Sequence, residues 1–282
     1  MNNSPWKDAL DRLISNKLSL IGSLYILFII FLALITPFIE PYDYAYQNLE
    51  LGPSPPSAEH WLGTDTLGRD LLTRMMYGSR VSLMVGFLAT IVALTIGVTW
   101  GTVAGFVGGK VDTIMMRIVD ILYGIPFIIF VILLMVIFGR NLILLFMAIG
   151  AVEWLTMARI VRSQVMSLSK QEFILAAEAM GVSKTGIIYK HLIPNTIGPV
   201  IVYATLTVPQ IMLLEAFLSF LGLGVQAPLS SWGLLIRDGA VSMEEYWWLL
   251  IFPSLAFSLT LFSLNFIGDG LRDALDPRTA DS

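Results

Sequence analysis

Two carboxylates stand inside apolar stretches of this sequence, and they are the side chains best placed to do chemistry. Glu153 and Glu215 each interrupt a run of apolar residues long enough to cross a bilayer. An ionisable group in such a run is a candidate for an ion or substrate pathway, because its burial in hydrocarbon is unfavourable. Structural polar contacts are the alternative for both, since Glu215 falls near the outer end of its span and Glu153 near the cytoplasmic end.

Other kinds of reactive site are poorly supported. The chain has no cysteine, which excludes thiolate metal ligands and cysteine nucleophiles. Its two histidines, His60 and His191, are far apart in the sequence, so no histidine metal site is expected. The sequence also lacks the Gly-x-x-x-x-Gly-Lys-Ser/Thr loop that cradles ATP phosphates. We therefore expect no catalytic residue, no bound metal and no bound cofactor on this chain.

The net charge and the residues within the spans argue against three further classes of protein. A net charge of −4 argues against a nucleic-acid partner, which needs a basic surface. A secondary transporter driven by an ion gradient would want several ionisable residues at mid-membrane and an inverted repeat, and neither is clear here. An intramembrane enzyme would want paired in-span aspartates or a histidine cluster, which the sequence lacks.

The elements that must position these residues are membrane spans. The chain is 56% hydrophobic and 13% charged, whereas soluble domains carry about 25% charged residues. Apolar stretches near 20 residues long predict an all-α membrane protein with about six transmembrane helices. The expected spans are Leu18–Ile39, Val81–Gly108, Ile118–Phe138, Leu142–Ala158, Thr196–Leu223 and Trp247–Gly268.

The distribution of basic residues predicts the orientation of these spans. Most of the 17 lysines and arginines fall on the side of the N-terminus, so the positive-inside rule places both termini in the cytoplasm. The expected organisation is a cytoplasmic tail (1–17), a first span (18–39), an extracytoplasmic loop with an interfacial helix (40–80), a core transmembrane domain (81–270) that contains a cytoplasmic loop (159–195), and a cytoplasmic C-terminal tail (271–282).

Several positions along the spans predict close packing or breaks. Small residues recur every fourth position from Ala89 to Gly109, which favours approach of a neighbouring helix in this chain or, alternatively, a second subunit. Three prolines, Pro126, Pro209 and Pro253, interrupt different spans and can kink them. Kinked helices suit a translocation path, but ordinary bends in a bundle explain them equally well. Leu71, Leu72, Met75 and Met76 share a face of the expected interfacial helix, which is either a lead-in or a gate element.

The cytoplasmic segment from residue 159 to 195 carries the strongest local pattern. Phe173, Ala176, Ala177 and Met180 are spaced as one stripe of a helix. Gly181 follows where a helix would end with a positive φ, and Ser183 is expected to cap a second short helix that ends before Pro194. Such a hairpin fits a partner's groove. The alternative is a linker packed on its own bundle.

This segment contains two motifs, Leu175-Ala176-Ala177-x-x-x-Gly181 and His191-Leu192-Ile193-Pro194-Asn195. Together they resemble the coupling loop, known as the EAA loop, of binding-protein-dependent ABC importer permeases. In that family the loop docks on the ATPase subunit. Leu175 stands where the family pattern has glutamate, which removes the ionic contact expected from that position.

Further motifs resemble the C-type subunit of the oligopeptide/dipeptide (peptide/nickel) permeases. They are Trp61-Leu62-Gly63-Thr64-Asp65-x-x-Gly68-Arg69-Asp70, Gly78-Ser79-Arg80-Val81-Ser82-Leu83 and the stretch from Leu214 to Gln226 that continues to Ser231-Trp232-Gly233. The resemblance implies a type I ABC importer fold in a bacterial inner membrane, with this chain as half of a heterodimeric pore. It also implies a second permease, two ATPase subunits that use ATP and Mg, and an extracytoplasmic solute-binding protein.

The resemblance and the residue patterns together define the candidate site residues. The substrate implied is an oligopeptide or dipeptide, with nickel or another small solute as the alternative. The external motif contributes Gly63, Asp65, Gly68, Arg69 and Asp70, and the gate or pore candidates are Pro209, Glu215 and Trp232. The candidates for coupling to the ATPase are Phe173, Ala176, Ala177, Met180, Gly181, His191 and Pro194.

Overall fold

The computed structural model describes residues 5–139 and 141–275 of the chain. Within them the regular structure is helical, with one isolated bridge between Thr64 and Asp70, so the all-α prediction is confirmed. Residues 1–4 and 276–282 of the two predicted tails lie outside the described residues. The helices are α1 (Pro5–Ser15), α2 (Lys17–Ile39), α3 (Leu71–Val107), α4 (Gly109–Tyr123), α5 (Phe127–Phe138), α6 (Leu142–Leu168), α7 (Glu172–Ala179), α8 (Lys184–Ile187), the π-helix η1 (Ile188–Leu192), α9 (Ile193–Phe220), α10 (Trp232–Val241) and α11 (Trp248–Leu275).

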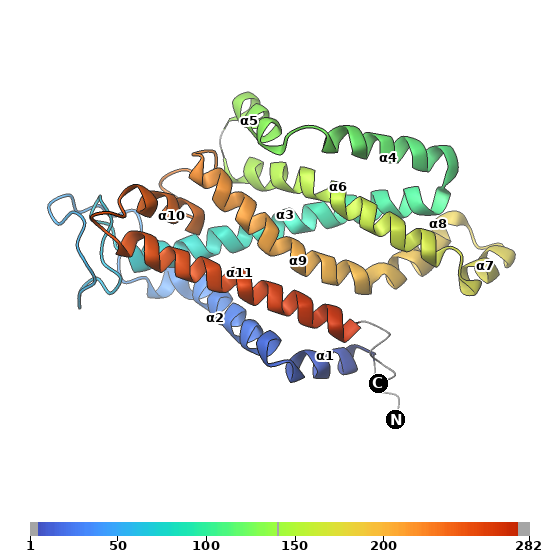
Figure 1. Cartoon of the computed structure of the whole chain (residues 1–282), viewed down its shortest axis with the longest axis horizontal. Helices are drawn as coiled ribbons and strands as arrows, with labels where there is room; N and C mark the ends of the chain where they lie inside the picture. The colour runs from blue at the N-terminus through green and yellow to red at the C-terminus, as the bar shows by residue number, and fades with distance from the viewer. Residues whose placement is uncertain (1–4, 140, 276–282) are drawn as a thin grey trace.

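The long helices α2, α3, α6, α9 and α11 run along the long axis of the molecule (Figure 1). Helices α1, α7 and α8 lie at one end, which we call the α7 end, and residues 40–70 with α10 lie at the opposite end, the α10 end. Among the described residues, five helices are long and apolar enough to cross a membrane, and α4 with α5 form a sixth candidate span. The count agrees with the prediction of about six spans.

The predicted interfacial helix before the second span is not a separate element. α3 begins at Leu71, where the Asp70 side chain accepts a hydrogen bond from the Thr73 N–H, and continues without a break to Val107. The residues between the expected lead-in and the span contain no proline that would stop the helix. At 37 residues, α3 is about 55 Å long and extends beyond a hydrocarbon core of about 30 Å.

The predicted third span is two helices rather than one. The axes of α4 and α5 are bent by 82° across the break. Pro126 has no N–H to donate and disfavours a helical conformation at Ile125, which explains why the helix stops. Helices α9 and α11 run through Pro209 and Pro253. Of the three prolines, Pro126 alone breaks its span.

The fourth span continues well beyond its predicted end at Ala158, because α6 runs to Leu168. Two arginines that the sequence places in a cytoplasmic loop are instead on this helix, where aspartates of α4 pair with them. Arg162 Nε lies 2.5 Å from Asp112 Oδ1, and Arg159 Nη2 lies 2.9 Å from Asp120 Oδ1. Charge at these positions therefore does not end the helix.

The stripe of small residues on α3 lets α6 approach closely. A Cβ on Gly97 would lie 2.6 Å from the Cβ of Met157, and one on Gly101 would lie 2.5 Å from the Ala158 carbonyl oxygen. Side chains larger than hydrogen would separate the two helices. The stripe therefore serves packing within the chain at these positions, as the first of the two predicted alternatives has it.

Candidate functional site

The hairpin formed by α7 and α8 projects from the α7 end of the bundle (Figure 1). Its first helix has one buried side, made by Ile174 and Ala177, which are 0% and 1% exposed. Phe173, Ala176 and Met180 are exposed. The predicted single stripe is therefore wrong for Ala177, because Ile174 three residues earlier shares its face and determines which side packs inward.

The buried side of α7 connects the hairpin to two spans. Ile174 and Ala177 belong to one apolar cluster with Val161 and Val165 of α6 and with Leu192, directly before α9. Close-packed side chains transmit displacement, because a packed interior has little room to deform. A partner that moves α7 would therefore move α6 and α9 with it.

Gly181 ends α7 in the conformation that the sequence predicts, with φ at +79°. The Val182 N–H donates to the Ala177 carbonyl and the Gly181 N–H donates to the Glu178 carbonyl, which is the Schellman pattern. The Ser183 side chain then accepts from the Gly186 N–H at 3.2 Å and caps α8. These two residues define the turn of the hairpin.

The second helix of the hairpin, α8, ends at Ile187, before Pro194 as the sequence predicts, but no loop follows it. The chain continues from α8 through η1 into α9, and Pro194 lies in the first turn of α9. A proline is tolerated there because N–H groups in the first turn of a helix have no acceptor within that helix. The His191 carbonyl oxygen accepts from Asn195 Nδ2 at 2.6 Å. The hairpin is therefore joined to α9 without an intervening loop.

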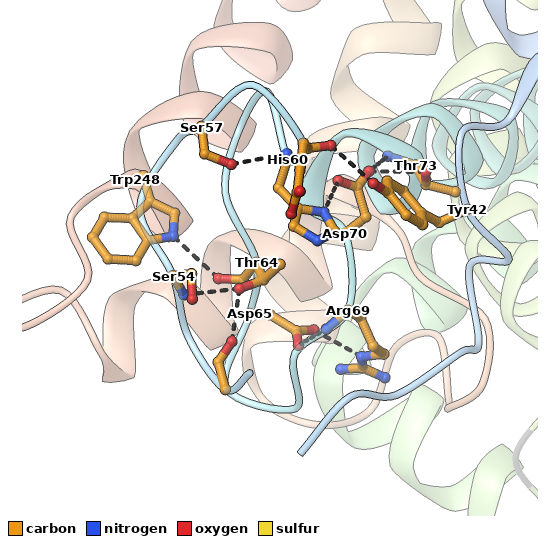
Figure 2. A network of polar contacts seen from close by, with 12 residues as sticks. Tyr42, Ser54, Ser57, His60, Thr64, Asp65, Arg69, Asp70, Thr73 and Trp248 are labelled. Atoms are coloured by element: carbon orange, nitrogen blue, oxygen red, sulfur yellow. Dashed lines mark hydrogen bonds and ion pairs between the residues drawn. The ribbon is translucent and has the colours of Figure 1, made fainter. Parts of the chain in front are cut away.

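A second polar site lies at the α10 end and centres on Asp65 (Figure 2). One carboxylate oxygen accepts from Arg69 Nε at 2.7 Å and from Arg74 Nη1 at 2.5 Å. The other accepts from the backbone N–H groups of Leu67 and Arg69. All three charged side chains are buried or nearly so, with 7%, 12% and 3% of Asp65, Arg69 and Arg74 exposed. Asp65 therefore holds the loop onto the first turn of α3.

Asp70 ties the same loop to the start of α3 from the other side. It accepts from His60 Nδ1 at 2.9 Å and from the N–H and hydroxyl of Thr73 at 2.8 and 2.9 Å (Figure 2). Gly63 and Gly68 have φ of +83° and +67°, and a Cβ on Gly68 would overlap the Asn48 carbonyl oxygen. The external motif is thus a folded unit whose five predicted residues lie together.

The carboxyl group of Glu215 is fully buried where α3, α9 and α10 meet. Ser219 Oγ donates to it at 2.7 Å, and Ser82 Oγ lies 3.5 Å from its other oxygen. Ser82 Oγ also accepts from the Trp232 N–H at 3.1 Å, and Ser231 Oγ lies 3.4 Å from Ser219 Oγ. This serine cluster gives Glu215 the structural polar contacts that the sequence leaves as one of two alternatives.

The other two gate or pore candidates are also packed inside the chain. Trp232 is 1% exposed and its Nε1 donates to the Met75 carbonyl at 3.1 Å, while Pro209 is buried within α9. Trp232 shares Ser82 with Glu215, and Pro209 stands apart from both. Sequence reasoning placed Ser82 in a family motif but did not connect it with Glu215. The local sign of a polar cluster was Ser219, one helical turn after Glu215.

Replacing Glu215 by alanine is expected to destabilise the bundle, because the buried hydroxyls lose their acceptor. The loss is about 1–3 kcal/mol, or several degrees in melting temperature for a chain of this size. Thermal unfolding of the detergent-solubilised protein measures it, and Glu215→Gln, which keeps an acceptor, should lose less. An alanine variant with unchanged melting temperature and abolished uptake would instead assign Glu215 to the translocation path.

Comparison with known proteins finds two matching family models. Residues 97–281 match the family described as binding-protein-dependent transport system inner membrane component. Residues 4–56 match the N-terminal TM domain of oligopeptide transport permease C. The two matches together extend over most of the chain, and the first contains the hairpin, the serine cluster apart from Ser82, and the broken span.

Individual relatives extend the comparison to nearly full length. The chain is 50% identical over 277 residues to the oligopeptide transport system permease protein OppC of Escherichia coli strain K12, covering 98% of this chain and 92% of that protein. It is 48% identical over 273 residues to the dipeptide transport system permease protein DppC of Bacillus subtilis, covering 96% and 85%. Among solved structures, the inward-facing MetNI methionine ABC transporter matches with a TM-score of 0.60 at 19% identity, over 71% of this chain and 94% of that one. That likeness shows the transmembrane fold.

Proposed function

The chain belongs to the family of binding-protein-dependent transport system inner membrane components, and we propose that it forms half of a heterodimeric pore that imports peptides at the expense of ATP. The fold is that of a type I ABC importer transmembrane domain. The relatives are named for oligopeptide and dipeptide transport, and these names support a peptide as the substrate.

The observation that carries the proposal is the mechanical connection of the hairpin. α7 presents Phe173, Ala176 and Met180 outward, while Ile174 and Ala177 pack against α6 and the start of α9. A partner docked on the exposed side therefore pulls on two spans at once. This is what a permease needs if the work of ATP hydrolysis is done on another subunit.

The partners follow from the two ends of the molecule. We assign the α7 end to the cytoplasm, with both termini, because the basic residues favour that side. Two separate ATPase subunits would use ATP and Mg there, with one of them docked on α7. At the α10 end, the folded loop from residue 40 to 70 would face an extracytoplasmic solute-binding protein. The remaining partner is a second, homologous permease.

In the proposed cycle, ATP binding brings the two ATPases together and displaces α7 with the residues packed on it. The attached spans rock, the pore opens outward, and the solute-binding protein delivers its peptide. Hydrolysis and product release return the pore to the inward-facing state. The chain itself transmits the movement and performs no bond-breaking step.

Purification and uptake assays test the proposal. The tagged chain, expressed with the genes of its importer, is expected to co-purify with stoichiometric ATPase, and proteoliposomes should take up labelled di- and tripeptides only with ATP and the solute-binding protein. Nickel uptake in the same vesicles tests the alternative substrate. Uptake driven by an ion gradient, with no ATPase bound, would contradict the proposal.

A further inference from the structure

A cavity of about 350 Å³ lies where the third span breaks between α4 and α5. The chain from Tyr123 to Phe127 forms one wall, Glu153 and Thr156 of α6 form another, and Leu214 of α9 contributes from a third element. Its volume is within the range of small-molecule sites, and a mostly apolar wall with a few polar groups is typical of such sites. Three parts of the fold therefore converge on one carboxyl group, that of Glu153.

The position of Glu153 differs from the sequence-based expectation. Because α6 continues to Leu168, the side chain does not mark the cytoplasmic end of its span. It lies roughly 16 Å along the helix axis from Leu142, about half of a hydrocarbon core near 30 Å thick. The carboxyl is therefore close to mid-membrane, where an ionisable group is expected to have a function.

Glu153 has no hydrogen-bond or ion-pair partner among the residues that the structure describes. The contrast with Glu215 is direct, because the serine cluster around Glu215 satisfies that carboxyl. Irregular backbone at membrane depth, as at Gly124 to Pro126, is tolerated where it lines a water-filled cavity. The break thus opens a cavity onto the Glu153 carboxyl, which no described residue pairs with.

We infer that this cavity is a subsite of the translocation path, in which Glu153 receives a primary ammonium group of the passing peptide. A cation there offsets the unfavourable burial of an unpaired carboxylate, and the apolar walls made by Ile125 and Leu214 accommodate the adjoining side chain. The inference rests on the proposed function. Two parts of a peptide carry this chemistry, the free amino terminus and a lysine side chain.

Labelling of a cysteine placed in the cavity tests the charge preference directly. The chain has no cysteine of its own, so Thr156→Cys, exposed in the cavity, gives a unique thiol on this subunit. In the complete importer, 2-aminoethyl methanethiosulfonate should react about tenfold faster than the anionic 2-sulfonatoethyl reagent, relative to Ser242→Cys at the α10 end. Adding Glu153→Gln should abolish this preference, whereas Glu153→Asp should keep it. An equal preference with and without the carboxylate, or a thiol inert to both reagents, would overturn the inference.

Protection by peptides identifies the ligand group. Trialanine should slow labelling of Thr156→Cys about tenfold, and N-acetyl-trialanine should not. N-acetyl-Lys-Ala-Ala distinguishes the two sources, since protection by it extends the site to lysine side chains and its failure restricts the site to the amino terminus. No difference between trialanine and its acetylated form would overturn the inference. Labelling is read without ATP, so its failure is separate from a failure of ATP-dependent uptake.

Discussion

Replacing Gly181 by valine is expected to uncouple ATP hydrolysis from uptake while the importer remains assembled. The residue has φ of +79°, a conformation that costs an L-residue about 1–2 kcal/mol and is a true outlier for a β-branched side chain. No heavy atom lies within 4 Å of a Cβ at this position, so the effect is backbone strain rather than a clash. Relief of that strain breaks the Schellman turn and redirects α7. ATPase activity and uptake, measured in the same proteoliposomes, should show roughly fivefold less peptide carried per ATP hydrolysed.

Gly109→Val is the matched control for strain alone. Gly109 has φ of +56°, and a Cβ added there would likewise have no heavy atom within 4 Å. It lies at the corner between α3 and α4 and belongs to neither helix of the hairpin. Its variant should carry nearly as much peptide per ATP as the unsubstituted importer. A normal ratio in Gly181→Val, or an equal loss in both variants, would contradict the role assigned to α7.

Sequence reasoning correctly located the features that depend on residues close together in the chain. A glycine after an apolar helical stripe predicted the positive φ at Gly181, and a serine two positions later predicted the cap of α8. Capping and positive φ depend on contacts within a few residues. The clustering of the external motif was likewise readable, because its five members, from Gly63 to Asp70, are close neighbours in the chain.

The features that sequence reasoning misplaced depend on distant contacts. Arg162 suggested a loop, but Asp112, 50 residues earlier, pairs with it and lets α6 continue. That extension moves Glu153 from a helix end to mid-membrane. The partner of Glu215 on α3, Ser82, is 133 residues away, and no periodicity in the sequence connects them. The burial of Ala177 could not be predicted for the same reason, since it packs with Ile174 on residues of other helices.

Replacing Asp65 by asparagine is expected to be strongly destabilising, because one oxygen of this carboxylate serves two arginines. Asparagine can keep the acceptor for the Leu67 and Arg69 N–H groups, but its amide nitrogen would then face Arg69 and Arg74 as a third donor. Arg74 is 3% exposed and cannot turn to water. Loss of one partner of a buried ion pair costs about 3–5 kcal/mol. Thermal unfolding in detergent and the amount of chain in the membrane would measure the effect.

Removing the charge of Arg74 as well separates the electrostatic part of the stability lost in Asp65→Asn from any loss of packing. Asp65→Asn with Arg74→Met removes the most deeply buried guanidinium together with its counter-ion, so the double variant should be more stable than Asp65→Asn alone. Glu50→Gln, an exposed carboxylate of the same loop, should unfold like the unsubstituted protein. If the losses in unfolding free energy of the two substitutions simply added, Asp65 would stabilise the protein through its contacts with backbone N–H groups. The charge of Arg74 would then be neutralised by another group.

Asp238 of α10 is the carboxyl that could compensate the charge of Arg74 once Asp65 is lost. Desolvation raises the pKa of Asp238, and the positive charges of Arg74 and Arg237 lower it against that larger effect. The charge of Arg74 is therefore a secondary influence on the pKa of Asp238, whereas Asp65 accepts directly from the Arg74 guanidinium. The double variant Asp65→Asn with Arg74→Met should be more stable than Asp65→Asn only if Asp238 does not neutralise Arg74 in the single variant. Adding Asp238→Asn to Asp65→Asn should then cost little more in melting temperature than Asp65→Asn alone.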